Sequence, residues 1–233
     1  MNSVKLKPQI QSLSSSQNAD EESTRQQRTI NILGVAGSMR QESYSTLGLK
    51  MVLEEAKKYG SESHLLDLRD RNLPLYDPGA PSSNDTSFNN SNNVLEKITT
   101  ALKWADALVL ASPDYHGSMS GTLKNFLDYF WEDFAGKTFG YIIASHEKGL
   151  TVADQMRTAV RQCYGWSMPY NISINGEKDF DSEGNLVNSA LVKRIKMLAR
   201  DLVTYGTLIR RQFLQDVADH QILDTYASHY RDL

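Results

Sequence analysis

The sequence has a single cysteine, no excess of positive charge and no long apolar run, and each shortage excludes a class of protein. Cys163 is the one cysteine among 233 residues, which excludes an internal disulfide framework and fits a reducing compartment such as the cytoplasm. A net charge of −3 and a pI near 6.0 give no basic field that would attract nucleic acid. No apolar run approaches the roughly 20 residues that a bilayer requires, so we expect no membrane span.

The side-chain patterns of several kinds of catalytic site are also missing. No nucleophile–base pair and no paired carboxylates stand at a recognisable spacing. His116 has no second histidine, cysteine or carboxylate at ligand spacing, so we expect no metal site. The sequence therefore indicates no catalytic side chain of its own.

The first 28 residues differ in composition from the rest of the chain. Residues 9–28 are rich in Gln, Ser and Glu and contain almost no aromatic or β-branched residue, which is typical of a disordered tail. The segment has neither the apolar core of a secretory signal nor the acid-poor composition of a transit peptide. We expect a disordered tail over 1–28, a folded domain over 29–215 and a C-terminal extension over 216–233.

From residue 29 onward, apolar strand patterns alternate with helical patterns. Such alternation predicts an α/β domain with a parallel sheet and right-handed crossovers. The segment 69–91 contains three prolines and a run of Asn and Ser, so we expect an irregular surface connection there. The expected strands are 29–36, 63–68, 106–112, 138–145 and about 167–174. The expected helices are 44–59, 92–104, 121–133, 150–164 and 188–215 or beyond.

A polar loop follows the first expected strand. Residues 37–45 contain the hydroxyl groups of Ser38, Ser43 and Ser45 together with Arg40. Free N–H groups at the start of the following helix favour a phosphate, and an arginine can add two charge-assisted hydrogen bonds. An ordinary serine-capped turn is the alternative. The position after the first strand of a β/α pattern favours phosphate binding.

A second loop follows the expected strand 106–112. Pro113 ends that strand because proline has no N–H to donate to the ladder. Gly117 and Gly121 allow the backbone to approach a ligand closely. Ligands of open α/β sheets bind beyond the carboxyl ends of the strands, so the loop 113–121 should hold a flat molecule with polar edges.

The two loops together resemble those of the NADPH-dependent FMN reductase family, flavodoxin-like flavoproteins that include quinone, azo-dye and chromate reductases. In that family a G-S-x-R-x-x-S-[FY]-[NS] loop holds the FMN phosphate, and a P-[ED]-Y-[NH]-[GS] segment borders the flavin ring. The matches are GSMRQESYS at 37–45 and PDYHGSMSGTLKNFLD at 113–128, and the resemblance covers roughly residues 29–200. Residues 113–121 also resemble the organoarsenical-oxidising branch of the superfamily.

The resemblance implies a flavodoxin-like three-layer sandwich with a five-stranded parallel sheet in the order 2-1-3-4-5. Such folds bind FMN where the strand order reverses, between the first and third strands. In the family a glycine-rich third loop also borders the flavin; the segment 145–150 has only Ser145 and Gly149 as clear equivalents. His116 stands where many members have Asn.

The resemblance also implies the roles of the loop residues. The serines and Arg40 would hold the FMN phosphate, Tyr44 would cover it, and the segment from Pro113 to Gly117 would direct backbone N–H groups at the flavin edge. The expected cofactor-binding residues are Ser38, Arg40, Ser43, Tyr44, Ser45, Pro113, Asp114, Tyr115, His116, Gly117, Ser145 and Gly149.

The implied reaction is hydride transfer from NADPH to N5 of FMN, followed by transfer to a second acceptor such as free flavin or a quinone, in a ping-pong sequence. The expected partners are NADPH, a small-molecule acceptor and further copies of the chain, as a homodimer or homotetramer. Two alternatives stay open: a flavodoxin-like electron carrier, and a flavin-dependent regulatory module whose tail 1–28 recruits a partner. Arg40 and the modest net charge favour the reductase, because flavodoxins usually lack that arginine and are strongly acidic.

Several residues near the second loop are expected to be structural. Asn125 should brace the turn 113–121, and Lys124 should be solvated. The aromatic residues Phe130, Trp131 and Phe134 should lie in the core or at a subunit interface. Cys163 should be buried as a small apolar residue.

Overall fold

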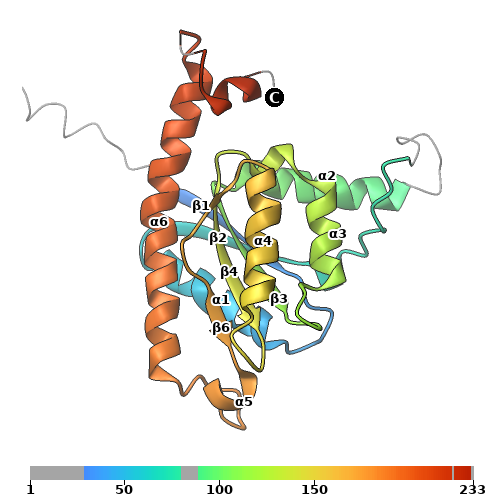
Figure 1. Ribbon diagram of the computed structural model, residues 1–233, viewed down its shortest axis with the longest axis vertical. Helices are drawn as coiled ribbons and strands as arrows, with labels where there is room; N and C mark the ends of the chain where they lie inside the picture. Colours follow the sequence, from blue (N-terminus) through green and yellow to red (C-terminus); the bar gives the residue numbers. More distant parts are fainter. Residues whose placement is uncertain (1–28, 80–88, 222, 232–233) are drawn as a thin grey trace, which may run out of the picture.

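The computed structural model describes residues 29–79, 89–221 and 223–231 (Figure 1). The side chains of residues 89–92 are outside this description. The expected disordered tail over 1–28 lies outside the described residues.

A parallel sheet forms the centre of the fold. Strands β1 (Ile30–Ala36), β2 (Ser61–Asp67), β3 (Ala107–Pro113) and β4 (Thr138–Ala144) lie in the order β2-β1-β3-β4. Residues of β1 pair directly with both neighbours, as Gly34 does with Leu65 and Val109. Every residue of β3 is buried, as expected for a strand covered on both faces. The predicted order 2-1-3-4-5 is confirmed.

The fifth predicted strand is wrong as a single element. In its place the segment 166–174 contains two short strands, β5 (Trp166–Ser167) and β6 (Ile172–Ile174), and both pair with β4. Pro169 lies between them, and it has no N–H with which to continue the ladder. Pairing stops after Met168 N–H donates to Phe139 O over 2.8 Å and resumes where Ile172 meets Ile142.

Helices cover both faces of the sheet (Figure 1). On one face lie α1 (Tyr44–Lys57) and α6 (Ser189–Ala218), which contact each other, and on the other lie α2 (Asn89–Trp104), α3 (Gly121–Tyr129) and α4 (Leu150–Gln162). A short helix, α5 (Gly176–Asp179), follows β6. Among the described residues there are also the 3₁₀ turns η1 (Leu68–Asp70), η3 (Glu132–Phe134) and η4 (Tyr226–Tyr230). The predicted three-layer sandwich is confirmed.

Three helices end earlier than expected: α1 at Lys57 and α4 at Gln162, each two residues early, and α3 at Tyr129. The third helix ends at Tyr129 and not at 133, because Phe130 takes an extended backbone with φ −125°. This turns the rings of Phe130 and Phe134 toward Phe126, with centroids 5.3 and 6.1 Å from it. Trp131, in contrast, is 59% exposed. The last helix extends to Ala218, in agreement with the expected helix over 188–215 or beyond.

The C-terminal extension packs back against the domain. Ala227 in η4 is buried with Ala135 and Phe213, and Tyr226 and Tyr230 pack against this small cluster. The indole N–H of Trp166 donates to the Tyr226 hydroxyl over 2.8 Å. Nearby Cys163 follows α4 and is only partly buried, and this burial raises the pKa of its thiol.

In the part of the chain that the structure describes, no helix has the length and apolar character required to cross a bilayer.

Candidate functional site

The loops that follow β1 and β3 are joined at their bases. Gly37 N–H donates to Ala111 O over 2.8 Å, and the Ser120 hydroxyl donates to Gly37 O over 2.6 Å. A Cβ on Gly37 would lie 2.7 Å from Cβ of Leu123, so a larger residue would force the two loops apart. The two loops matched by motif are therefore neighbours in space.

The loop 37–45 leads into the N-terminus of α1 with its serines turned inward. Ser38, Ser43 and Ser45 are all buried, and the hydroxyls of Ser43 and Ser45 lie 2.8 Å apart. Ser43 is the N-cap of α1, yet its side chain makes no capping hydrogen bond. The first helical turn also contains no acidic residue. Its N–H groups are therefore not used by a capping side chain, which suits an anion.

Arg40 is exposed beside this helix start and forms no ion pair with any residue that the structure describes. Its backbone N–H donates to the Ser38 hydroxyl over 3.2 Å. A cleft of about 610 Å³ adjoins the loop and is also lined by Lys50 and Arg69. Buried hydroxyls, an uncapped helix start and an arginine without a carboxylate partner together fit a phosphate group.

Tyr44, the first residue of α1, packs its ring against a residue that follows α5. Its ring centroid is 5.2 Å from that of Phe180. A Cβ on Gly176 would lie 2.0 Å from the Tyr44 ring. In this structure the ring packs on the start of α5, and its expected contact with a phosphate stays a prediction.

Residues 115–118 form a tight two-residue hairpin. Tyr115 and Ser118 exchange backbone hydrogen bonds of 3.0 Å in both directions. The two central residues, His116 and Gly117, have φ of 56° and 77°, as in the type I′ turns that favour Asn-Gly. Histidine is among the residues that tolerate this left-handed region. The replacement of Asn by His at position 116 therefore preserves the turn.

Most backbone N–H groups of this hairpin are used within the protein. Those of Asp114, Tyr115 and Gly117 donate to Ala144 O, Ser118 O and the Asp114 carboxylate. Among the described residues, the N–H of His116 has no such acceptor. The segment from Pro113 to Gly117 was expected to direct its backbone N–H groups at a ligand. Among the described residues, the His116 N–H is the donor of this segment that is left for one, and its contact with flavin stays a prediction.

Asp114 connects the hairpin to the third loop. Its carboxylate accepts from Gly117 N–H over 2.8 Å and from the Ser145 hydroxyl over 2.9 Å. Gly149, at the start of α4, has φ of 57°, and a Cβ there would lie 2.5 Å from Cγ2 of Ile143. Both expected residues of the third loop thus hold its shape against β3 and β4.

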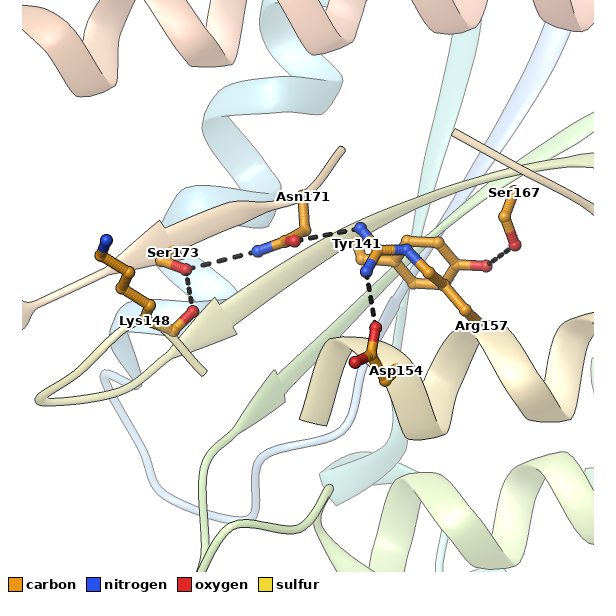
Figure 2. Close-up of polar contacts among 7 residues, drawn as sticks. All are labelled: Tyr141, Lys148, Asp154, Arg157, Ser167, Asn171 and Ser173. Carbon is orange, nitrogen blue, oxygen red and sulfur yellow. Dashed lines mark hydrogen bonds and ion pairs between the residues drawn. The ribbon is translucent and has the colours of Figure 1, made fainter. Parts of the chain in front are cut away.

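A polar network supports the third loop from the side of β6. Figure 2 shows Arg157 of α4 donating to both Asp154 and Asn171 over 3.0 Å, and Asn171 donating to Ser173 over 3.3 Å. The Ser173 hydroxyl in turn donates to Lys148 O. The Arg157 guanidinium also lies 5.7 Å from the centre of the Tyr141 ring. Asn171, between β5 and β6, thus links Arg157 of α4 to Ser173 of β6, which in turn holds the third loop.

Three supporting residues were missed in the sequence. Ser120 caps α3 by accepting from Leu123 N–H, and the Ser112 hydroxyl accepts from Ser120 N–H over 2.9 Å. Gln155 of α4 accepts from the Ser118 hydroxyl over 2.9 Å and from Met119 N–H over 3.2 Å. A serine just before a helix could have been identified as a cap. Nothing in the sequence around Gln155 indicated its contact with the hairpin.

Asn125 was expected to brace the turn 113–121, but its side chain forms hydrogen bonds with a different segment. Its side chain accepts from Tyr76 N–H and donates to Pro74 O, both over 2.7 Å, so it fixes the connection after β2. Lys124 pairs with Asp128 at 2.5 Å on the helix surface. Among the described residues, no group of three or more His, Cys, Asp or Glu side chains could hold a metal ion.

Comparison with known proteins gives a consistent assignment. The sequence model of the NADPH-dependent FMN reductase family matches residues 30–179. An FMN-dependent NADPH-azoreductase of Staphylococcus saprophyticus is 26% identical over 179 residues, which cover 73% of this chain and 92% of that protein.

Solved structures support the fold. FerB, an NAD(P)H:(acceptor) oxidoreductase from Paracoccus denitrificans, has a TM-score of 0.60 and 19% identity, and the match covers 76% of this chain and 97% of that one. An archaeal flavodoxin has a TM-score of 0.53 and 11% identity, covering 76% of this chain and 99% of that one. At these identities the likeness shows a flavodoxin-like fold.

The family model spans most of the described domain. The two loop motifs meet at the carboxyl ends of the central strands β1 and β3. The prediction of an oxidoreductase class that uses FMN and NADPH is thereby confirmed. The chain belongs to the NADPH-dependent FMN reductase family.

Proposed function

We propose that this chain is an NAD(P)H-dependent oxidoreductase that holds FMN on the loops after β1, β3 and β4 and reduces a small-molecule acceptor. The observation that carries the proposal is the start of α1, where buried serines surround a helix N-terminus without a side-chain cap and where Arg40 has no carboxylate partner among the described residues. When bound, FMN would supply the hydride chemistry, and the protein would supply binding, orientation and electrostatics.

The phosphate group would be held by the loop 37–45. Ser43 and Ser45 would donate hydroxyl hydrogen bonds, and the helix N–H groups would add their own. Arg40 would neutralise charge and is the group best placed to distinguish a phosphorylated flavin from an unphosphorylated one. Tyr44 lines the same cleft as Arg40 and Ser43 while its ring packs on Phe180, so we propose that it forms a wall of this cleft.

The flavin ring would lie against the 115–118 hairpin. The His116 N–H is the one donor of the turn that is left for a ligand among the described residues. A donor that is fixed by the backbone can stabilise negative charge that develops on reduction. Tyr115, which is half exposed at the hairpin, would contribute an aromatic surface.

The order of events would be ping-pong. NADPH would bind, be oxidised and leave before the acceptor occupies the same exposed face of the site. Free flavin, a quinone or an azo compound are the acceptor classes that the family suggests. The cytoplasmic location and the homodimeric or homotetrameric assembly expected from the sequence stay predictions.

A visible spectrum of the purified protein, followed through anaerobic addition of NADPH, tests this proposal. Flavin absorption that bleaches with NADPH and returns when a quinone is added would support the reductase. Bound flavin that NADPH does not bleach would favour the electron carrier or the regulatory module. Absence of any flavin binding, even in titration with FMN, would contradict the proposal altogether.

A further inference from the structure

A second cavity lies at the free edge of the sheet, between β2 and α2. Its volume is about 520 Å³, within the range of small-molecule sites. The cavity shares no lining residue with the loops 37–45, 113–121 or 145–149. It is therefore separate from the candidate flavin site.

The floor of this cavity is apolar. Leu33 of β1 and Leu66 of β2 come from the sheet, and Ile98 and Ala101 come from the facing side of α2. Leu33, Leu66 and Ile98 are buried members of the main core on that face. The apolar part of a bound molecule would therefore contact side chains of the hydrophobic core.

The two charged side chains that line the cavity, Arg71 and Lys97, are both basic, and the polar residues Ser63 and His64 accompany them. Arg71 follows η1, Lys97 lies on α2, and His64 lies on β2. The residues that line the cavity in the described part of the chain include no aspartate or glutamate. The lining contrasts with that of the cleft beside the loop 37–45, where Asp67 and Glu183 accompany the basic residues.

Arg71 is the most informative of these residues. Its Nε atom is buried and has no hydrogen-bond partner, and its side chain forms no ion pair with any residue that the structure describes. Burial of a charged donor without a partner is costly. The neighbouring Arg69 shows the usual alternative, since it pairs with Asp67 at 3.1 Å.

His64 is held in place at the rim. Its ring stacks on Trp104 with the centroids 4.2 Å apart and the planes 8° from parallel. The Trp104 contact therefore fixes the position of the His64 side chain, which lines the cavity together with Arg71 and Lys97.

We propose that this cavity is a binding site for a small organic anion, with an aromatic or alkyl body on Leu66 and Ile98 and a carboxylate or sulfonate head paired with Arg71. A guanidinium matches such a head with two parallel hydrogen bonds. Lys97 adds a second positive charge at the more exposed end of the cavity. The proposal is independent of the reductase activity.

Calorimetric titration of the FMN-saturated full chain with naphthalene-1-sulfonate tests this site. We expect saturable binding of one molecule, weakened about tenfold or more by Arg71→Gln, the loss expected when a charge-assisted pair is removed. Lys97→Gln should weaken binding in the same direction by a smaller factor. The uncharged analogue 1-naphthalenemethanol should bind about tenfold more weakly than the sulfonate.

Matched substitutions on α6 serve as controls. Arg211→Gln and Lys196→Gln remove the same charges from exposed positions and should leave the affinity unchanged. The NMR signals of the His64 ring should shift on binding, because His64 lines the cavity. Absence of binding, equal affinity in Arg71→Gln and wild type, or an unmoved His64 ring at saturation would each overturn the proposal.

Discussion

Asp114 and Ser145 lie 31 residues apart in the chain and share a hydrogen bond of 2.9 Å. The same carboxylate accepts from Gly117 N–H over 2.8 Å. One side chain therefore fixes both the hairpin after β3 and the loop after β4. We regard Asp114 as a positioning residue for the candidate flavin site.

Asp114→Ala should weaken FMN binding about tenfold, because two hydrogen bonds to a charged acceptor are lost and the two loops become independent. The measurement is the quenching of FMN fluorescence during titration with protein. Ser145→Ala removes only one of the two bonds and should give a smaller loss. The same FMN affinity in Asp114→Ala and wild type would show that the bound loops do not depend on this link.

Arg40→Ala should reduce FMN affinity strongly while the melting temperature of the flavin-free protein stays within about 1 °C of wild type, because exposed side chains contribute little to stability. Arg211→Ala provides a matched control, since Arg211 is exposed on α6. Riboflavin, which lacks the phosphate, should bind equally to Arg40→Ala and wild type. An equal loss for riboflavin and FMN would refute a phosphate contact by Arg40.

His116→Val should lower the melting temperature by several degrees. A β-branched residue at φ 56° is strained by roughly 1–2 kcal/mol, and for a domain of this size each kcal/mol corresponds to about 2–4 °C. His116→Asn should have almost no effect, because Asn tolerates this region of backbone space. Equal melting temperatures for the Val and Asn variants would argue against the type I′ turn.

Lys137 should make stability depend on pH. Burial and the nearby Arg210 lower its pKa to about 7, against weaker opposing effects of Asp133 and Asp106, and its Nζ donates to Leu102 O over 2.5 Å. The unfolded chain, with its ordinary pKa of about 10.4, binds more protons between these two values. The contribution of Lys137 to the free energy of unfolding is therefore least favourable below pH 7 and improves as the pH rises toward 10.

The comparison of Lys137→Met with wild type isolates this effect from other titrating groups. The stability advantage of the Met variant should be largest at pH 6 and should shrink by about 1.4 kcal/mol for each unit of pKa shift as the pH rises to 10. Urea unfolding at several pH values measures it. A constant difference between the two proteins across this range would mean that Lys137 titrates in the folded protein as it does in the unfolded chain.

The sequence predicted most of the fold because the strands β1 and β3 are continuous apolar runs, each bounded by glycine or proline. Both were placed to within one residue. The break at Pro169 was missed because the apolar content of the segment continues through it. The early end of α3 was missed because it depends on the packing of Phe130 against Phe126, which the local sequence does not encode.

The candidate site likewise has features that the sequence predicted and features that it could not predict. The loops at 37–45 and 113–121 were located because each motif is contiguous in the chain. The link from Asp114 to Ser145 and the contact of Gln155 with Ser118 join residues 31 and 37 positions apart, so they required the fold. The packing of the Tyr44 ring on Phe180 likewise joins residues far apart in the chain.

The interruption between β5 and β6 has a consequence for association between molecules. A long straight strand at the edge of a sheet exposes a row of unpaired N–H and C=O groups, onto which a strand of another molecule can be added. Here that row is divided into a two-residue and a three-residue piece separated by a proline. The break, whose residue Asn171 contacts Ser173 beside the third loop, therefore deprives this edge of the length that strand-by-strand aggregation requires.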